Sequence, residues 1–299
     1  MSSSSSSSSS SSLSSSRSSP TADVLPEDDL IFPIVRSPED DRDFVYEHIS
    51  QGRATAVAPP STLDLRKYLN PPRNQGRKGA CAAFSASAIK EYHERLDVGF
   101  EEYMSPDSIY VYRANKPSSG MFLRDVMAIL SERGIAPERD VPYTQDEPAP
   151  LSDAVVERAR DYKIASYAQV HTIEGLKEAL YLNGPCLIAF PVYDARPKFW
   201  TVNKDPTQKG GHVVTVVGYT KDAFIIRNSW GANWNGDGTI LYPFSEWGSH
   251  WECWSAVDEA SPRIIPPVSV CVRRYQTLCE ELFALVLFNS DHFFHRTMS

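Results

Sequence analysis

No stretch of this 299-residue chain is apolar over the roughly 20 residues that a transmembrane helix requires, so we expect no membrane-spanning helix. The N-terminus also lacks the apolar core of a secretory signal, because residues 2–19 are almost all serine. Such a tract has nothing to bury, and residues 1–20 are therefore expected to be a disordered Ser-rich leader. We expect the protein to be cytoplasmic or exported without a signal peptide.

Positive charge is in deficit, and paired cysteine motifs are missing. The 38 Asp and Glu residues outnumber the 30 Lys and Arg residues, and a net charge of −8 argues against binding to a nucleic-acid backbone. The cysteines are odd in number and none forms a C-x-x-C pair, so neither a metal site nor any other cofactor is expected. Cys186 lies in an apolar run and is expected to be a small buried side chain. The cysteines are Cys81, Cys186, Cys253, Cys271 and Cys279.

Four polar residues stand at spacings that suit a cysteine nucleophile and its partners: Gln75, Cys81, His212 and Asn228. A thiol must become a thiolate before it attacks a carbonyl group well, and a neighbouring imidazolium and a helix N-terminus both favour this. Small or apolar residues at four-residue intervals predict a helix over 81–96 with one buried face. Cys81 would then lie in the first helical turn, where the macrodipole favours an anion.

Two neighbouring strands are expected to bring the imidazole and the amide together. His212–Tyr219 is rich in β-branched residues, and Ala223–Asn228 returns after a short turn. If Tyr219 pairs with Ala223, His212 falls opposite Trp230 and Asn228 is its diagonal neighbour. The Asn228 amide would then accept from one ring nitrogen and hold the other toward the thiol. Gln75 would supply an oxyanion donor beside the backbone N–H of Cys81.

Together, these and further motifs resemble those of papain-family cysteine peptidases over roughly residues 61 to 256. The matching residues are Leu63-Asp64-Leu65-Arg66, Asn74-Gln75-Gly76, Cys81 followed by Ala83-Phe84-Ser85, Gly184-Pro185, His212, and Asn228-Ser229-Trp230-Gly231 continuing to Trp234 and Gly238.

The resemblance implies an α+β, papain-like fold of two lobes with the active-site cleft between them. The catalytic domain is expected over 61–260, with a helical lobe at about 61–165 and an antiparallel β-rich lobe at about 166–260. Local patterns add helices at 107–113 and 123–133 and a strand at 186–192. By the same resemblance, Trp230 would shield the bond between His212 and Asn228. The implied substrate-binding residues are Gly120, Met121, Gly211, Trp230 and Trp234.

Two departures from the family pattern concern the nucleophile's neighbours. Lys78 stands where the family usually has a disulfide-forming cysteine, and Ala82 stands where it usually has tryptophan. The missing bridge predicts that the domain folds without a disulfide, since it does not require an oxidising compartment.

The segments that flank the catalytic domain have no counterpart in the pattern. Residues 21–60 are acidic and contain an extended apolar run, Leu30–Val35, interrupted by Pro33. A short helix is expected to open at Ser37-Pro38-Glu39. The 21–60 segment is expected either to cover the cleft and inhibit or to brace the domain elsewhere. Residues 261–299 form a C-terminal extension of unknown role.

The sequence therefore predicts a cysteine endopeptidase that hydrolyses polypeptides through an acyl-thioester on Cys81. His212 would act as base and acid, Asn228 would orient it, and Gln75 would stabilise the oxyanion. A transferase or ligase would use the same thioester with an amine in place of water. A catalytically silent binding module is the other alternative, although such modules usually lose one of these four residues.

Overall fold

A seven-stranded sheet, antiparallel at every pair of neighbouring strands, forms the centre of the fold in a computed structural model that describes residues 32–50, 58–202 and 206–258. The strand order is β2-β7-β3-β4-β5-β6, and β1 pairs with β4. The strands are β1 (Leu63–Asp64), β2 (Ile164–Gln169), β3 (Cys186–Val192), β4 (Gly210–Tyr219), β5 (Ala223–Arg227), β6 (Thr239–Pro243) and β7 (Glu252–Asp258).

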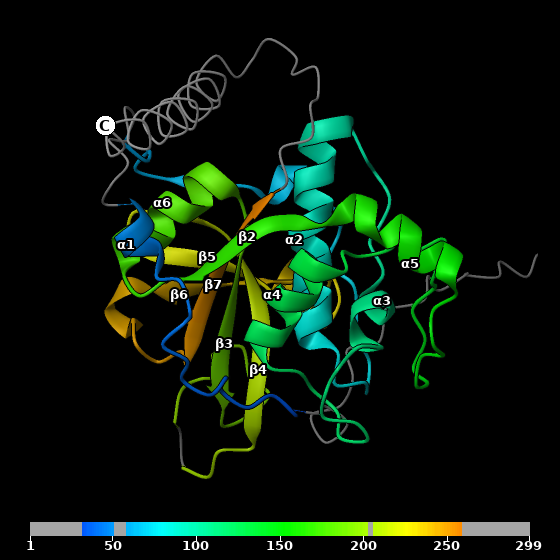
Figure 1. The fold of residues 1–299 in the computed structure, drawn as a ribbon. Coiled ribbons are helices and arrows are strands. Elements are labelled where there is room, and N and C mark those ends of the chain that lie inside the picture. Colours follow the sequence, from blue (N-terminus) through cyan, green and yellow to red (C-terminus); the bar gives the residue numbers. More distant parts are fainter. Residues whose placement is uncertain (1–31, 51–57, 203–205, 259–299) are drawn as a thin grey trace, which may run out of the picture.

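Most helices come from the first half of the chain and lie beside the sheet (Figure 1). The α-helices are α1 (Tyr46–Ser50), α2 (Cys81–Val98), α3 (Pro106–Tyr110), α4 (Leu123–Glu132), α5 (Asp153–Ala159) and α6 (Ile173–Asn183), of which the first four belong to the first half. The α+β architecture agrees with the expectation from the sequence. Strand β1 from the helical half pairs with β4, and helix α6 packs against β7 and β4 of the β-rich half.

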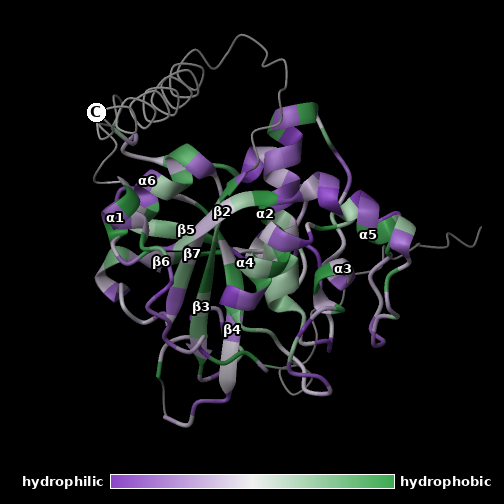
Figure 2. Cartoon of the chain, viewed as in Figure 1, coloured by the Kyte–Doolittle hydropathy of each residue, from purple (hydrophilic) through white to green (hydrophobic). Residues whose placement is uncertain are grey.

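The long helix α2 carries Cys81 as its first residue and ends where Gly99 takes a φ of 69°. Glycine adopts this left-handed conformation at little cost and so ends the helix. Side chains 81–94 are all buried, so the prediction of a single buried face was wrong. The Ala-rich first half passes between the sheet and the other helices, whereas Leu96 lies beyond this packing and is 47% exposed. In Figure 2 strand β3, against which α2 packs, is mostly green.

The hairpin of β4 and β5 departs from the expected register at its turn and returns to it near the site. Tyr219 pairs with Phe224 rather than Ala223. A bulge between Val216 and Gly218 inserts one residue, and beyond it Thr215 pairs with Arg227 as predicted. His212 therefore has the expected alignment with the residues that follow β5.

The helix expected to open at Ser37 is absent, because tertiary contacts hold that stretch extended. The Ser37 N–H donates to Glu252 Oε1 at 2.8 Å, and the Ser37 hydroxyl accepts from the Arg124 N–H at 3.3 Å. The helix forms instead at 46–50 as α1. The expected 107–113 helix is shorter and spans 106–110. Within the described ranges, no helix is long and apolar enough to cross a membrane.

Candidate active site

Cys81 lies at the N-terminus of α2, beside strand β4. The N-cap residue Ala80 has no side chain that could cap the helix, so the first-turn N–H groups have no capping side chain. The Cys81 thiol contacts the backbone of Val213, the residue after His212. The thiol on α2 and the imidazole on β4 therefore lie close together.

His212 and Asn228 form the expected hydrogen-bonded pair. The His212 Nε2–H donates to Asn228 Oδ1 at 2.8 Å, and the Ser229 N–H donates to the same oxygen at 2.7 Å. Trp230 stacks on the imidazole, with ring centroids 4.5 Å apart, and so shields this bond from water. The buried His212 Nδ1 has no hydrogen-bond partner among the described residues, which leaves it free to accept the thiol proton.

Hydrogen bonds from both the backbone and the side chain of Gln75 hold it next to Ser229 and Lys78. Its N–H donates to the Ser229 carbonyl at 2.8 Å, and the neighbouring Asn74 pairs with Trp230. In the side chain, Oε1 accepts from the Ser229 hydroxyl at 2.6 Å and Nε2 donates to the Lys78 carbonyl at 2.9 Å. An amide nitrogen has two hydrogens, so one remains for an oxyanion.

Residues 32–34 of the 21–60 segment lie across the site, and we call residues 32–45 the N-terminal arm. Pro33 pairs with Gly211, the Gly211 N–H donates to the Phe32 carbonyl at 3.1 Å, and the Phe32 ring meets Trp230 edge-on at 6.0 Å. On the opposite wall, a Cβ built on Gly120 would lie 2.5 Å from the Pro33 oxygen. Figure 1 shows this blue segment passing in front of β3 and β4.

The arm therefore occupies the positions expected to bind substrate. Gly120 and Gly211 contact it directly, and Met121 belongs to the same buried cluster as Ile34 and Cys81. Trp234 lies behind Trp230, with the two ring centroids 5.4 Å apart. Leu30 and Ile31 of the predicted apolar run lie outside the described residues, as do the leader and residues 261–299.

Beneath the arm the thiol and the imidazole are fully buried. Cys81 and His212 are both 0% exposed. Burial raises the pKa of the Cys81 thiol to about 11 and lowers the pKa of His212 to about 4, although the hydrogen bond that His212 donates to Asn228 acts to raise the pKa of His212. Burial disfavours the charged form of each group, so the covered site does not hold a thiolate and an imidazolium.

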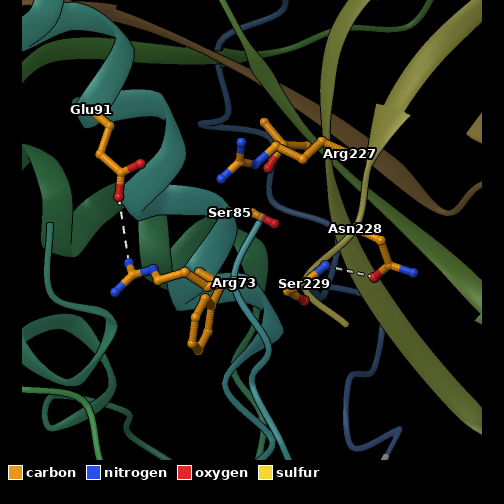
Figure 3. A pocket seen from close by; sticks show the side chains of 8 residues that line it. Arg73, Ser85, Glu91, Arg227, Asn228 and Ser229 are labelled. Carbon is orange, nitrogen blue, oxygen red and sulfur yellow. Dashed lines mark hydrogen bonds and ion pairs between the residues drawn. The ribbon is translucent and has the colours of Figure 1, made fainter. Parts of the chain in front are cut away.

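A small polar cavity lies between α2 and the end of β5, and Asn228 is one of its lining residues (Figure 3). Glu91 accepts from Arg73 Nη2 at 3.4 Å and from the Met104 N–H at 3.1 Å, and the Arg227 guanidinium projects toward the same space. Burial raises the pKa of Glu91 to about 7, although both arginines lower it. The residues that line the cavity come from both the helical half, such as Glu91, and the chain segment that carries Asn228.

Two residues of the site were not predicted from the sequence. Ser229 bridges Gln75 and Asn228, and its place in the Asn-Ser-Trp-Gly run was the available signal. Phe199 packs edge-on against His212 at 5.4 Å and stands in a loop without a recognisable pattern. No group of three His, Cys, Asp or Glu side chains suited to a metal is found in the parts of the chain that the structure describes. Cys81, Cys186 and Cys253 are free thiols, and the other two cysteines lie outside those parts.

Comparison with known proteins identifies relatives of this site. A family model described as papain family cysteine protease matches residues 59–249. "Cysteine proteinase 3" of Entamoeba histolytica is 27% identical over 217 residues, which cover 66% of this chain and 67% of that protein. Cathepsin K of Mus musculus is 28% identical over 199 residues, covering 61% of this chain and 59% of the relative. The chain thus spans about three fifths to two thirds of the length of these relatives.

Among solved structures, xylellain, a cysteine protease from Xylella fastidiosa, superposes with a TM-score of 0.61 at 27% identity. The match covers 76% of this chain and 96% of that structure. The resemblance inferred from the sequence motifs and the expected α+β fold are both confirmed by these comparisons.

Proposed function

Because the chain belongs to the papain family of cysteine proteases, we propose that it is an endopeptidase that hydrolyses peptide bonds through an acyl-thioester on Cys81. The observation that carries this proposal is the buried pair of His212 and Asn228 beside the thiol, with the Gln75 amide held at the same wall. These groups have the types and the order of contacts that acyl transfer by a cysteine requires.

In the proposed reaction, His212 Nδ1 takes the thiol proton while Asn228 holds the ring from its other nitrogen. The sulfur forms a bond to the peptide carbonyl carbon, and the resulting oxyanion accepts from the free Gln75 amide hydrogen and the Cys81 N–H. The C–N bond then breaks, and the leaving amine takes its proton from the imidazolium. Water, deprotonated by the neutral imidazole, attacks the thioester and releases the acid and the thiol.

A cleavage assay with an amine acceptor tests this reaction. The full-length chain is incubated with a peptide substrate, with and without an excess of a small primary amine, and the products are identified by mass spectrometry. We expect free carboxylic acids as the main products, and no turnover for Cys81→Ala. Cys186→Ala is the matched control, because Cys186 is also a buried free thiol and its Sγ–H donates to the Gly184 carbonyl at 3.6 Å. Amide products would instead identify a transferase, and activity in Cys81→Ala would overturn the proposal.

We further propose that the N-terminal arm inhibits the enzyme by occupying its substrate-binding positions. Pro33 lies between Gly120 on one wall and Gly211 on the other, and Ile34 is 1% exposed within the cluster that includes Cys81. The proline ring leaves Pro33 without an N–H, so the arm lacks a donor that a substrate strand would have. Contacts outside the cleft tether the arm, including the ion pair of Asp43 and Arg124. Tethering raises the effective concentration of the arm into the millimolar range, so modest contacts suffice.

A further inference from the structure

Lys78 lies three residues before Cys81, and all the hydrogen-bond partners of its ammonium group are inside the protein. Its side chain is 5% exposed, and Nζ donates to Asp107 Oδ1 at 2.5 Å. The same nitrogen donates to the carbonyls of Thr144 at 3.1 Å and Asp146 at 2.8 Å. An ammonium group has three donors, so all three are satisfied. A buried lysine with complete partners fixes the loop that carries it.

The backbone of Lys78 faces the catalytic groups. Its carbonyl accepts from Gln75 Nε2 at 2.9 Å and from the Ala80 N–H at 2.8 Å. One carbonyl oxygen therefore orients both the proposed oxyanion donor and the residue that precedes Cys81. Movement of this oxygen would rotate the Gln75 amide away from the position that an oxyanion occupies.

The loop itself has little intrinsic rigidity. Gly76 has a φ of 63°, and Gly79 follows Lys78, so glycine stands on both sides of the anchoring residue. Glycine leaves the backbone many accessible conformations unless other contacts remove them. The contacts come from segment 143–146: the Tyr143 hydroxyl and Gln145 Nε2 donate to the Gln75 carbonyl at 2.7 and 2.9 Å. Segment 143–146 thus holds both ends of the loop, and the Lys78 ammonium adds a charged anchor through its ion pair with Asp107.

We propose that Lys78 is a positioning residue that aims the Gln75 amide at the oxyanion, a task performed by the buried ion pair with Asp107. The proposal rests on the oxyanion role given to Gln75 above. The ion pair lies where the family usually has a disulfide-forming cysteine, and it joins the loop to α3 without a redox-sensitive bond. Lys78 acts on the developing negative charge only through Gln75, so its effect belongs to turnover and not to substrate affinity.

A double-mutant cycle in the full-length chain tests this role. Removing one partner of a buried ion pair is strongly destabilising, whereas removing both charges is often tolerated. One arm of the cycle is therefore the paired change Lys78→Met with Asp107→Asn, and the other arm is Gln75→Ala. The introduced amide still offers an oxygen to the Thr144 N–H, which Asp107 Oδ2 accepts at 3.1 Å. We expect kcat to fall between about tenfold and a hundredfold with KM nearly unchanged, since small displacements of catalytic groups have effects of this size. In a Gln75→Ala background the same pair of changes should have almost no further effect on kcat.

Two measurements separate positioning from general damage. Alkylation of Cys81 by iodoacetamide forms no oxyanion, so the alkylation rate of the Lys78→Met, Asp107→Asn variant should stay within about twofold of the parent rate. The matched control is Lys90→Met, which removes a buried lysine of the same helical half that pairs with Glu94 at 3.0 Å. It should lower Tm and leave kcat unchanged. If the losses of kcat add up in the cycle, Lys78 does not act through Gln75, and its positioning role is wrong while the oxyanion role of Gln75 stands. If Gln75→Ala keeps full kcat, both the oxyanion role of Gln75 and the positioning role of Lys78 are wrong.

Discussion

The inhibitory role of the N-terminal arm predicts that shortening one buried side chain of the arm activates the enzyme. Ile34 is 1% exposed and packs in the cluster that contains Cys81. Replacing a buried isoleucine by alanine costs roughly 2–4 kcal/mol, from the lost transfer free energy and the cavity left behind. When the arm is open, Ile34 contacts water, so this cost falls on the covered state. Each 1.4 kcal/mol is a factor of ten, so Ile34→Ala should raise the open fraction by roughly thirtyfold to several hundredfold.

The assay is the initial rate of hydrolysis of a small fluorogenic peptide, run in parallel with the alkylation rate of Cys81. Both rates should rise by the same factor until the open state dominates, because both report access to one thiol. Val35→Ala is the matched control, since Val35 is the next residue of the arm and is 56% exposed. It should change neither rate by more than about twofold. If Ile34→Ala lowers Tm while both rates stay at the parent value, the arm braces the domain and does not inhibit it.

Three further outcomes are expected. Gln75→Ala should lower kcat by roughly a hundredfold or more while KM changes little, and a change confined to KM would mean that Gln75 binds substrate instead. Glu91 has its folded-state pKa raised to about 7 from 4.5, so its contribution to stability is full below about pH 4.5 and is lost as the pH rises through about 7. The free energy of unfolding of the parent, relative to that of Glu91→Gln, should therefore fall by ~3 kcal/mol across this window, and Tm measured at several pH values should record the fall. A difference in Tm between the two proteins that does not change with pH would contradict the raised pKa of Glu91. Tm should be the same with and without reductant, since Cys81, Cys186 and Cys253 are free, and a drop of many degrees in reductant would reveal a bridge.

The sequence was informative wherever a local pattern coincides with a chemical requirement. The apolar run of residues 186–192 has the same bounds as strand β3, and Cys81 is the first residue of α2 as expected. His212 and Asn228 come together because the pattern predicts the pairing of their two strands. Gln75 is brought to them by the bridge between Asn74 and Trp230, which the pattern did not predict. Helix α6 was missed although Thr172 caps it by accepting from the Gly175 N–H, a signal that was readable.

Contacts between distant segments could not be read in the same way. The helix expected at Ser37 gave way to hydrogen bonds with Glu252 and Arg124, which no local pattern encodes. The bulge in β4 lies where Gly218 approaches the Leu63 carbonyl of β1, a contact with a third strand that the hairpin's own sequence does not reveal. Lys78 was recognised only as a departure from the family pattern, because its partner Asp107 is 29 residues away in the sequence.

The most direct test of the account is the site of covalent labelling by a thiol-directed epoxide inhibitor of cysteine peptidases. The full-length chain and its Ile34→Ala variant are treated with the epoxide, digested, and analysed by mass spectrometry while residual peptidase activity is followed. The account predicts a single adduct on Cys81 that forms in step with the loss of activity and forms faster in Ile34→Ala. An adduct on another cysteine that accompanies complete inactivation, or full activity with Cys81 quantitatively modified, would contradict it.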